Sequence, residues 1–221
     1  MAHTYLPINI STRDRKCLVV GGGSVALRKI ETLLDYRMAI TVIAPEVHDK
    51  IGYHAERKLL QLEKREYKSP EAALFNIVIS ASDDEAVNKQ VYDDARGAGV
   101  LVNVVDNPPL CDFTFPAVVR RDALALAIST DGKAPFLSGH LRSILETIFP
   151  EHWTKMMQLA GRFRKMVQER WPESIEKRMA CFGRFVEADW KMLVKEKDDQ
   201  ALEQVLIGMV EGTYVPENPE D

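Results

Sequence analysis

Residues 17–26 read Cys-Leu-Val-Val-Gly-Gly-Gly-Ser-Val-Ala, and this stretch decides the fold. Its apolar first four residues are typical of a buried strand, and they lead through three glycines into a pattern typical of a helix. A strand, a glycine turn and a helix in this order form the arrangement in which amides at the start of a helix bind a dinucleotide pyrophosphate. Glycine turns between strands and helices are also common without any ligand, but in this sequence the strand and the helix stand where the motif requires them.

The small residues of this turn have separate roles. Gly21 permits the tight turn, the middle of the loop at Gly22 and Gly23 lets the backbone approach a pyrophosphate, and Ala26 lets the helix pack on the strand. Ser24 is the predicted N-cap of the helix. The glycine turn therefore predicts a dinucleotide-binding site.

Composition excludes several classes of protein. The chain has 221 residues, of which 46% are hydrophobic and 28% charged, and its net charge of −4 disfavours a nucleic-acid partner. Its three cysteines are widely spaced, which indicates neither a disulfide framework nor a zinc site. We find no signal peptide and no apolar run of about 20 residues that could span a membrane. We therefore expect a soluble cytoplasmic protein.

Strands and helices alternate through the first half of the sequence. Apolar runs predict strands over Lys16–Val20, Ala39–Ile43, 76–81 and 100–105, and a further strand within 56–67. Helical patterns lie between them, from Ser24 and from the polar stretch 82–84 to about Arg96. This alternation predicts an α/β fold with a Rossmann-like parallel sheet.

The alternation stops after Pro108-Pro109. Strands are predicted over 113–119 and 123–129, joined by a turn at 120–122, and a helix from Pro135 to Phe149 follows. Residues 151–212 are predicted to be helical with a break at Pro172, and the acidic tail 216–221 is predicted to be disordered. We expect a dinucleotide-binding domain over 1–109, a hairpin-and-helix segment over 110–149 and a helical C-terminal domain over 150–221.

The choice of cofactor depends on the end of the second strand. An acid that binds the adenosine ribose is expected about 20 residues after the glycines, and Pro45-Glu46 stands there. No Lys or Arg lies between Met38 and Asp49, so the phosphate of NADP has no local partner. NAD is the predicted cofactor, although Glu46 is equally typical of a solvated loop carboxylate.

Polar or acidic residues also follow two other predicted strands. Ser82 and Asp83 stand where ligands bind in open α/β sheets, and they are also typical of a helix cap. Asp106 ends a strongly apolar strand, where a carboxylate could accept a proton as a carbon–hydrogen bond is oxidised beside NAD. An Asp before Asn-Pro-Pro is also typical of a turn, and the residues alone favour that interpretation.

Several motifs in order resemble the precorrin-2 dehydrogenase family, which includes the N-terminal part of siroheme synthase and stand-alone dehydrogenase/ferrochelatases. The resemblance extends over about residues 6–146. The motifs are Gly21-Gly22-Gly23-x-Val25-Ala26-x-Arg28-Lys29, Ala81-Ser82-Asp83-Asp84, Val102-Asn103-Val104-Val105-Asp106, and Phe113 to Pro116 followed by Ile128-Ser129-Thr130-x-Gly132-x-x-Pro135.

The resemblance implies oxidation of precorrin-2 to sirohydrochlorin with NAD, and in some members insertion of ferrous iron to give siroheme. Asp106 falls on the family's catalytic aspartate, and Ser24, Val25, Pro45 and Glu46 fall on positions that contact NAD. The expected partners are a tetrapyrrole substrate, ferrous iron as a further substrate, and a second copy of the chain that packs through residues 113–149. No resident metal is expected, since the sequence has no ligand spacing typical of one.

Two further interpretations concern the helical C-terminal region and the class of function. Eight basic residues between positions 155 and 184 could attract a tetrapyrrole bearing many carboxylates, although mixed charges on helices are more typical of a solvated face. A non-catalytic NAD-binding regulatory module is the alternative function, because it would keep the glycine turn and have no use for Asp106.

Overall fold

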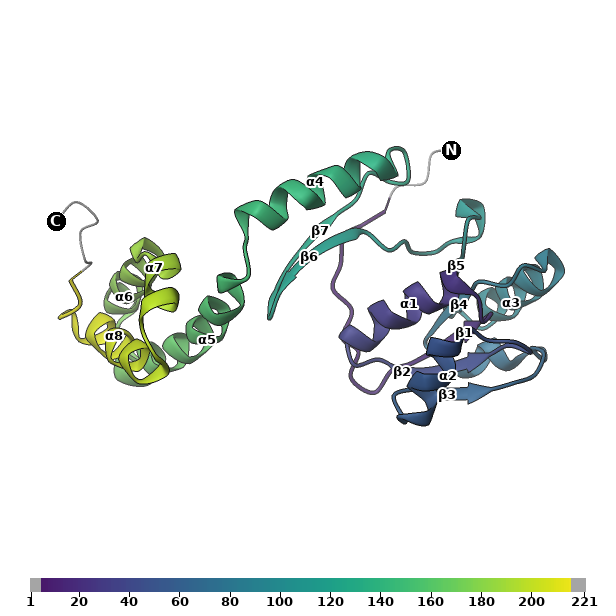
Figure 1. Ribbon diagram of the computed structural model, residues 1–221, viewed down its shortest axis with the longest axis horizontal. Helices are drawn as coiled ribbons and strands as arrows, with labels where there is room; N and C mark the ends of the chain where they lie inside the picture. Colours follow the sequence, from purple (N-terminus) through teal and green to yellow (C-terminus); the bar gives the residue numbers. More distant parts are fainter. Residues whose placement is uncertain (1–4, 216–221) are drawn as a thin grey trace. The chain divides into compact units, whose positions relative to one another are not determined.

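The computed structural model describes residues 5–215, and the chain divides into two units, Met1–Phe115 and Pro116–Asp221. The elements of each unit are labelled in Figure 1. The tail for which the sequence predicts disorder, residues 216–221, lies outside the described range.

The first unit is built on a five-stranded sheet. The strands pair in parallel in the order β3-β2-β1-β4-β5, which confirms the α/β fold class. Strands β1 and β2 have the predicted bounds, whereas β4 and β5 are one residue shorter at each end than predicted. The bounds are β1 Lys16–Val20, β2 Ala39–Ile43, β3 Gln61–Glu63, β4 Ile77–Ser80 and β5 Leu101–Val104.

Helices cover both faces of this sheet (Figure 1). Alternate residues of β1 point to opposite faces: Cys17 and Val19 pack in the cluster that contains α1 (Ser24–Asp35) and Ile51 of α2 (Asp49–Glu56). Leu18 and Val20 pack in the other cluster, with α3 (Glu85–Gly97) and the short helix η1 (Glu71–Leu74). All four of these β1 residues are buried, which is why the strand reads as a continuous apolar run.

The second unit starts with an antiparallel hairpin of β6 (Ala117–Arg121) and β7 (Leu124–Ile128). The predicted strand bounds were wrong here: Arg120 and Arg121 belong to β6 and pair with Ala125 and Leu124. The turn is Asp122-Ala123, and Asp122 has a φ of 53°, the left-handed conformation that tight hairpin turns use. Helix α4 (Pro135–Ile148) packs on both strands and ends one residue before the predicted limit.

The rest of the second unit is helical, as predicted. Pro172 lies between the first two of its helices, and the helices enclose a core centred on Phe163 and Leu206. Over the described residues, no helix combines the length and the apolar character needed to cross a membrane. The bounds are α5 His152–Arg170, α6 Ile175–Glu187, α7 Trp190–Glu196 and α8 Asp199–Glu211.

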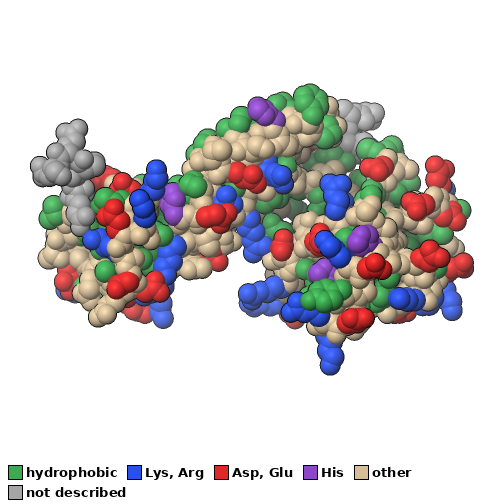
Figure 2. Space-filling model, viewed as in Figure 1, with side chains coloured by type: hydrophobic (Ala, Val, Ile, Leu, Met, Phe, Trp, Pro, Cys, Tyr) green, Lys and Arg blue, Asp and Glu red, His purple; other side chains and the backbone are tan. Residues whose placement is uncertain are grey.

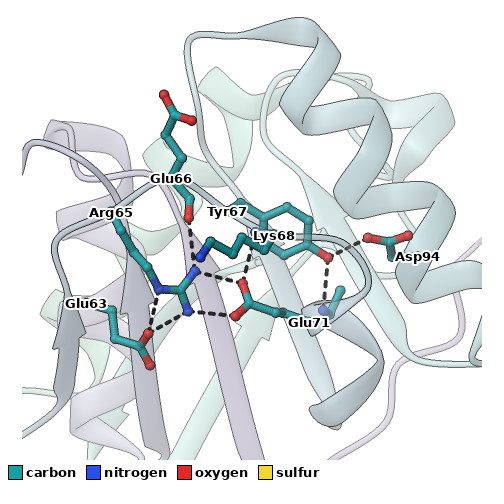
Figure 3. A network of polar contacts seen from close by, with 8 residues as sticks. Glu63, Arg65, Glu66, Tyr67, Lys68, Glu71 and Asp94 are labelled. Atoms are coloured by element: carbon teal, nitrogen blue, oxygen red, sulfur yellow. Dashed lines mark hydrogen bonds and ion pairs between the residues drawn. The ribbon is translucent and has the colours of Figure 1, made fainter.

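A polar network fixes the connection from β3 to β4 (Figure 3). The Arg65 guanidinium contacts the carboxylates of Glu63 at 2.5 Å and Glu71 at 2.6 Å. Its hydrogen bond to Glu71 is the main cause that lowers the pKa of Glu71. The Tyr67 hydroxyl donates to Asp94 of α3 at 2.6 Å and accepts from the amide of Ala72 at 3.0 Å. The network therefore ties this connection to α3.

Replacing the tyrosine of this network tests its contribution to stability. Tyr67→Phe leaves the amide of the fully buried Ala72 without its acceptor. We expect the free energy of unfolding, measured by urea denaturation, to fall by about 1–3 kcal/mol. The control Tyr53→Phe changes a tyrosine that is 54% exposed and should stay within about 0.5 kcal/mol of the wild type. Equal stability of the two variants would contradict the role given to the network.

Candidate functional site

The predicted site residues lie on loops at one edge of the sheet. In a parallel sheet all the carboxyl ends meet at the same edge, and here β1 lies between β2 and β4. The chain passes from β1 to β2 through α1 on one face, and from β4 to β5 through α3 on the other. The loops after β1 and β4 therefore flank the point where the winding of the sheet reverses, which is where open α/β sheets bind ligands.

The first two glycines of the turn are required by neighbouring loops. Gly21 has a φ of 119°, and a Cβ atom there would lie 2.2 Å from the carbonyl oxygen of Ala81. A Cβ on Gly22 would lie 2.1 Å from the carbonyl oxygen of Glu46. Gly23 differs, because a Cβ built there meets no atom within 4 Å. The open space beside this turn is therefore at Gly23.

The N-terminus of α1 is available to an anion. The prediction that Ser24 caps this helix was wrong, because Gly23 is the N-cap and Ser24 is the first helical residue. Within the described part of the chain no side-chain hydrogen bond caps this helix, and its first turn contains no acidic residue. The first amides of a helix lack partners within it and carry the positive end of its dipole. This uncapped end and the space at Gly23 fit the pyrophosphate of a dinucleotide.

Pro45 and Glu46 follow β2, and both side chains are exposed. The backbone of Glu46 lies against Gly22, so the loop after β2 packs directly on the glycine turn. The amide of His48 donates to the carbonyl of Gly22 at 2.8 Å and fastens the same contact. The Glu46 carboxylate thus lies at the sheet edge where a ribose acid is expected.

The loop after β4 is held by a residue that the sequence analysis missed. Asn88 accepts from the amide of Ser82 at 3.3 Å and donates to its carbonyl at 2.8 Å. The Ser82 hydroxyl accepts from the amide of Asp84 at 3.2 Å, and Asp84 is the N-cap of α3. Asp83 is exposed between them. The structure therefore gives Ser82 a role at the cap of α3, on the loop after β4.

Asp106 stands on the turn after β5. Its φ is 58°, and its side chain is exposed. The chain then folds back along β5, where the Asn103 side chain donates to the carbonyl of Phe113 at 2.8 Å. The Cys111 thiol donates to the carbonyl of Val104 at 3.1 Å. These bonds brace the turn from both sides and present the carboxylate of Asp106 to solvent.

A residue that the sequence analysis named only within a motif, without a role, lies near Asp106. Lys29 of α1 is half-buried, and its Nζ lies 4.3 Å from the centre of the Phe115 ring. Burial is the main cause that lowers the pKa of Lys29, while the charges of Asp106 and Cys111 act in the opposite direction. The amphipathic pattern of the helix marks Lys29 as an ordinary surface position, so the pattern gave no signal for it.

Most of the basic residues of the helical region have partners within their own unit. Their ammonium and guanidinium groups meet carboxylates, backbone carbonyls or the Trp171 ring, which favours the interpretation of a solvated or structural helix face. The contacts are Lys155 with Asp199, Arg162 with Glu203, Lys165 with Glu169, Arg178 with the Pro172 carbonyl, Arg184 with the Met209 carbonyl, and Arg170 and Lys177 with Trp171.

Comparison with known proteins defines the class of this site. Residues 8–117 match the protein family described as "Putative NAD(P)-binding". The prediction of a dinucleotide-binding domain is thereby confirmed.

Among individual proteins, the chain is similar to siroheme synthases. It is 44% identical over 156 residues to siroheme synthase of Methylococcus capsulatus and 39% identical over 156 residues to that of Nitrosococcus oceani. These matches cover 71% of this chain and 33% of each relative, so the chain spans about a third of the length of these relatives. The resemblance found in the motifs is confirmed.

A solved structure shares the fold over nearly the whole chain. The protein titled "SirC, precorrin-2 dehydrogenase" superimposes with a TM-score of 0.73 at 24% sequence identity. The alignment covers 94% of this chain and 100% of that one. The helical region predicted after the sheet is therefore part of the shared fold.

Substitutions in the glycine turn separate packing from ligand binding. In Gly22→Ala the new Cβ collides with the Glu46 carbonyl, so we expect a loss of about 1–3 kcal/mol in stability. In Gly23→Ala the Cβ enters open space, so stability should change by less than about 1 kcal/mol. The same Cβ stands beside the helix amides, and we expect the Kd for NADH to rise roughly tenfold. Thermal denaturation and NADH fluorescence titration measure both effects, and wild-type NADH affinity in Gly23→Ala would refute this assignment.

Proposed function

We propose that the protein is an NAD-dependent precorrin-2 dehydrogenase, which oxidises precorrin-2 to sirohydrochlorin. The observation that carries this proposal is the exposed carboxylate of Asp106, held on a braced turn at the same sheet edge as the uncapped start of α1. The similarity to siroheme synthases and the fold shared with a precorrin-2 dehydrogenase support it.

The loop after β2 supports NAD over NADP. Glu46 is exposed at the end of this strand, where its carboxylate can accept hydrogen bonds from the adenosine ribose. Between Met38 and Asp49 the sequence has no Lys or Arg to bind a ribose phosphate. A carboxylate at this point would also repel that phosphate.

In the proposed reaction, precorrin-2 loses a hydride and a proton. The bound nicotinamide supplies the hydride acceptor. The amides at the start of α1 bind the pyrophosphate, and the Glu46 carboxylate orients the adenosine ribose. The Asp106 carboxylate accepts the proton that leaves the macrocycle, as a general base.

Ferrous iron insertion into sirohydrochlorin is the second activity that the resemblance implies. Within residues 5–215, no group of three or more His, Cys, Asp or Glu side chains could hold a metal ion. We propose that iron enters as a substrate delivered directly to the macrocycle. Anaerobic incubation of sirohydrochlorin with ferrous iron, with and without the protein, tests this activity against the spontaneous rate.

The proposed cytoplasmic location is supported by the cysteines. Cys17, Cys111 and Cys181 are all free, and Cys17 and Cys181 are buried. Free thiols are typical of proteins in a reducing compartment.

A second copy of the chain is the proposed partner of α4. This helix exposes an apolar stripe with the spacing i, i+4, i+7 and i+11, which is one face of a helix. The helix also packs on β6 and β7. Such a face lowers the free energy of association when a second copy covers it. The stripe consists of Leu137, Leu141, Ile144 and Ile148, which are 41%, 37%, 42% and 55% exposed.

Removing the proposed base tests the activity. Asp106→Asn keeps a residue type that tolerates a positive φ, so we expect the fold and the NADH affinity to be unchanged. The kcat for NAD-dependent oxidation of precorrin-2, followed anaerobically by sirohydrochlorin absorbance, should fall about 10²–10⁴-fold. Asp122→Asn is the matched control, since Asp122 also has a positive φ of 53° and lies in the hairpin turn.

Two outcomes would refute this proposal. If the wild type converts no precorrin-2 with NAD, the chain is not this dehydrogenase. If Asp106→Asn retains wild-type function in the presence of bound NAD, the alternative of a non-catalytic regulatory module is favoured.

Introducing a charged side chain into the apolar stripe of α4 tests whether a second copy of the chain binds there. We expect the wild type to sediment at twice the mass of the 25.0 kDa chain, and Ile144→Asp to sediment as a monomer because a buried charge opposes association. Leu74→Asp is the control, since Leu74 is 77% exposed on η1 and should leave the mass unchanged. A wild type that sediments as a monomer, or a dimer that survives Ile144→Asp, would overturn the assignment.

A further inference from the structure

We propose that Lys29 binds a carboxylate of the tetrapyrrole and thereby places the macrocycle beside Asp106. This inference rests on the proposed function and adds a substrate-binding residue on α1. The ligand class is a polycarboxylate macrocycle, and the binding group is the Lys29 ammonium.

The position of Lys29 on α1 points it toward the site. Residues four apart on a helix share a face, so Lys29 lies on the same face as Val25 and about 6 Å farther along the helix axis. Val25 belongs to the uncapped first turn and is 37% exposed. Lys29 is therefore one turn away from the amides that are proposed to bind the pyrophosphate.

The segment that carries Asp106 packs against the same helix. Val105 and Phe115 pack on the hydrophobic cluster that includes Ala26 and Ile30 of α1. The Phe115 ring lies under the Lys29 ammonium at 4.3 Å from its centroid, and Phe113 braces that ring at a centroid separation of 5.6 Å. The ammonium group is therefore held between α1 and the segment that follows Asp106.

Among the described residues Lys29 is half-buried and forms no ion pair, whereas Arg65, the other half-buried cation of this unit, contacts two carboxylates. Lys89 and Arg96 each contact a carboxylate, at 2.6 Å and 2.5 Å. In the part of the chain that the structure describes, no carboxylate lies within 4.0 Å of the Lys29 ammonium, which lies over the Phe115 ring. A half-buried ammonium with only a ring beneath it is stabilised by an anion that approaches from the open side.

The charges around Lys29 agree with this arrangement. Burial and the like charge of Arg28 lower its pKa, whereas Asp106 and Cys111 raise it. Asp106 acts on Lys29 through its charge without forming an ion pair with it, so each group stays available for its own partner. Lys29 can bind a substrate carboxylate while the Asp106 carboxylate accepts a proton.

One fixed carboxylate has a specific effect on a large flat substrate. Stacking and nonpolar contacts hold the plane of a macrocycle but leave its rotation in that plane free. An ammonium that pairs with one peripheral carboxylate fixes this rotation, and it decides which ring carbon faces Asp106. Lys29 would therefore contribute to substrate affinity and to the orientation of the reacting carbon.

Three variants of the full chain test this proposal. Lys29→Met removes the charge and keeps most of the length, and Lys29→Arg restores a cation. Lys89→Met is the control for the loss of one positive charge, because Lys89 is 69% exposed and pairs with Asp93 on α3. For each variant the measurements are the Kd for sirohydrochlorin by absorbance titration, the Kd for NADH by fluorescence, and the KM and kcat for precorrin-2.

We expect Lys29→Met to raise the Kd for sirohydrochlorin and the KM for precorrin-2 roughly tenfold. Its NADH affinity and melting temperature should match those of the wild type, and Lys29→Arg should recover most of the sirohydrochlorin affinity. Lys89→Met should behave as the wild type in every measurement.

Other results separate this inference from the proposed function. Wild-type sirohydrochlorin affinity in Lys29→Met, with an active wild type, would overturn the role of Lys29 and leave the dehydrogenase intact. Weakened NADH binding with unchanged sirohydrochlorin affinity would assign Lys29 to the cofactor instead and equally overturn the proposal. A wild type that binds neither sirohydrochlorin nor precorrin-2 would refute the proposed function itself.

Discussion

The contact on which the first unit depends is the close approach of three loops at the glycine turn. Gly21 lies against the carbonyl of Ala81, and Gly22 lies against the carbonyl of Glu46, at distances that leave no room for a Cβ atom. The loops after β1, β2 and β4 are thereby packed into one layer of backbone. The start of α1 and the loops that carry Glu46 and Ser82 meet in this layer, so the glycines determine where these groups lie, whereas Asp106 stands on the separate turn after β5.

This packing changes the meaning of the glycine motif. The glycines of this motif are usually explained by the close approach of a ligand. Here the packing of neighbouring loops is enough to require the first two glycines. Loop packing does not require a glycine at position 23, because the space beside Gly23 is open. The part of the motif that points to a ligand is therefore its last glycine together with the uncapped end of α1.

The sequence predicts the elements whose residues are buried on both sides and misses features that depend on contacts distant in the chain. β1 and β2 match their predicted bounds because their apolar runs end at glycine and proline. The hairpin strands were misplaced because the alternation of a half-exposed strand does not mark where its turn lies. The roles of Asn88 and Lys29 were missed because they depend on a loop carbonyl and an aromatic ring, and the sequence of their own helices indicates neither partner.

The left-handed conformation of Asp106 limits which side chains the turn can carry. Asp and Asn tolerate this conformation well because their short polar side chains bond locally, whereas longer side chains are less common there. A carboxylate at this point is thus most easily provided by aspartate, and a glutamate would place its charge one methylene farther out on a more strained backbone. The backbone of the turn therefore selects the length of the acid, and with it the distance at which the charge stands from the sheet edge.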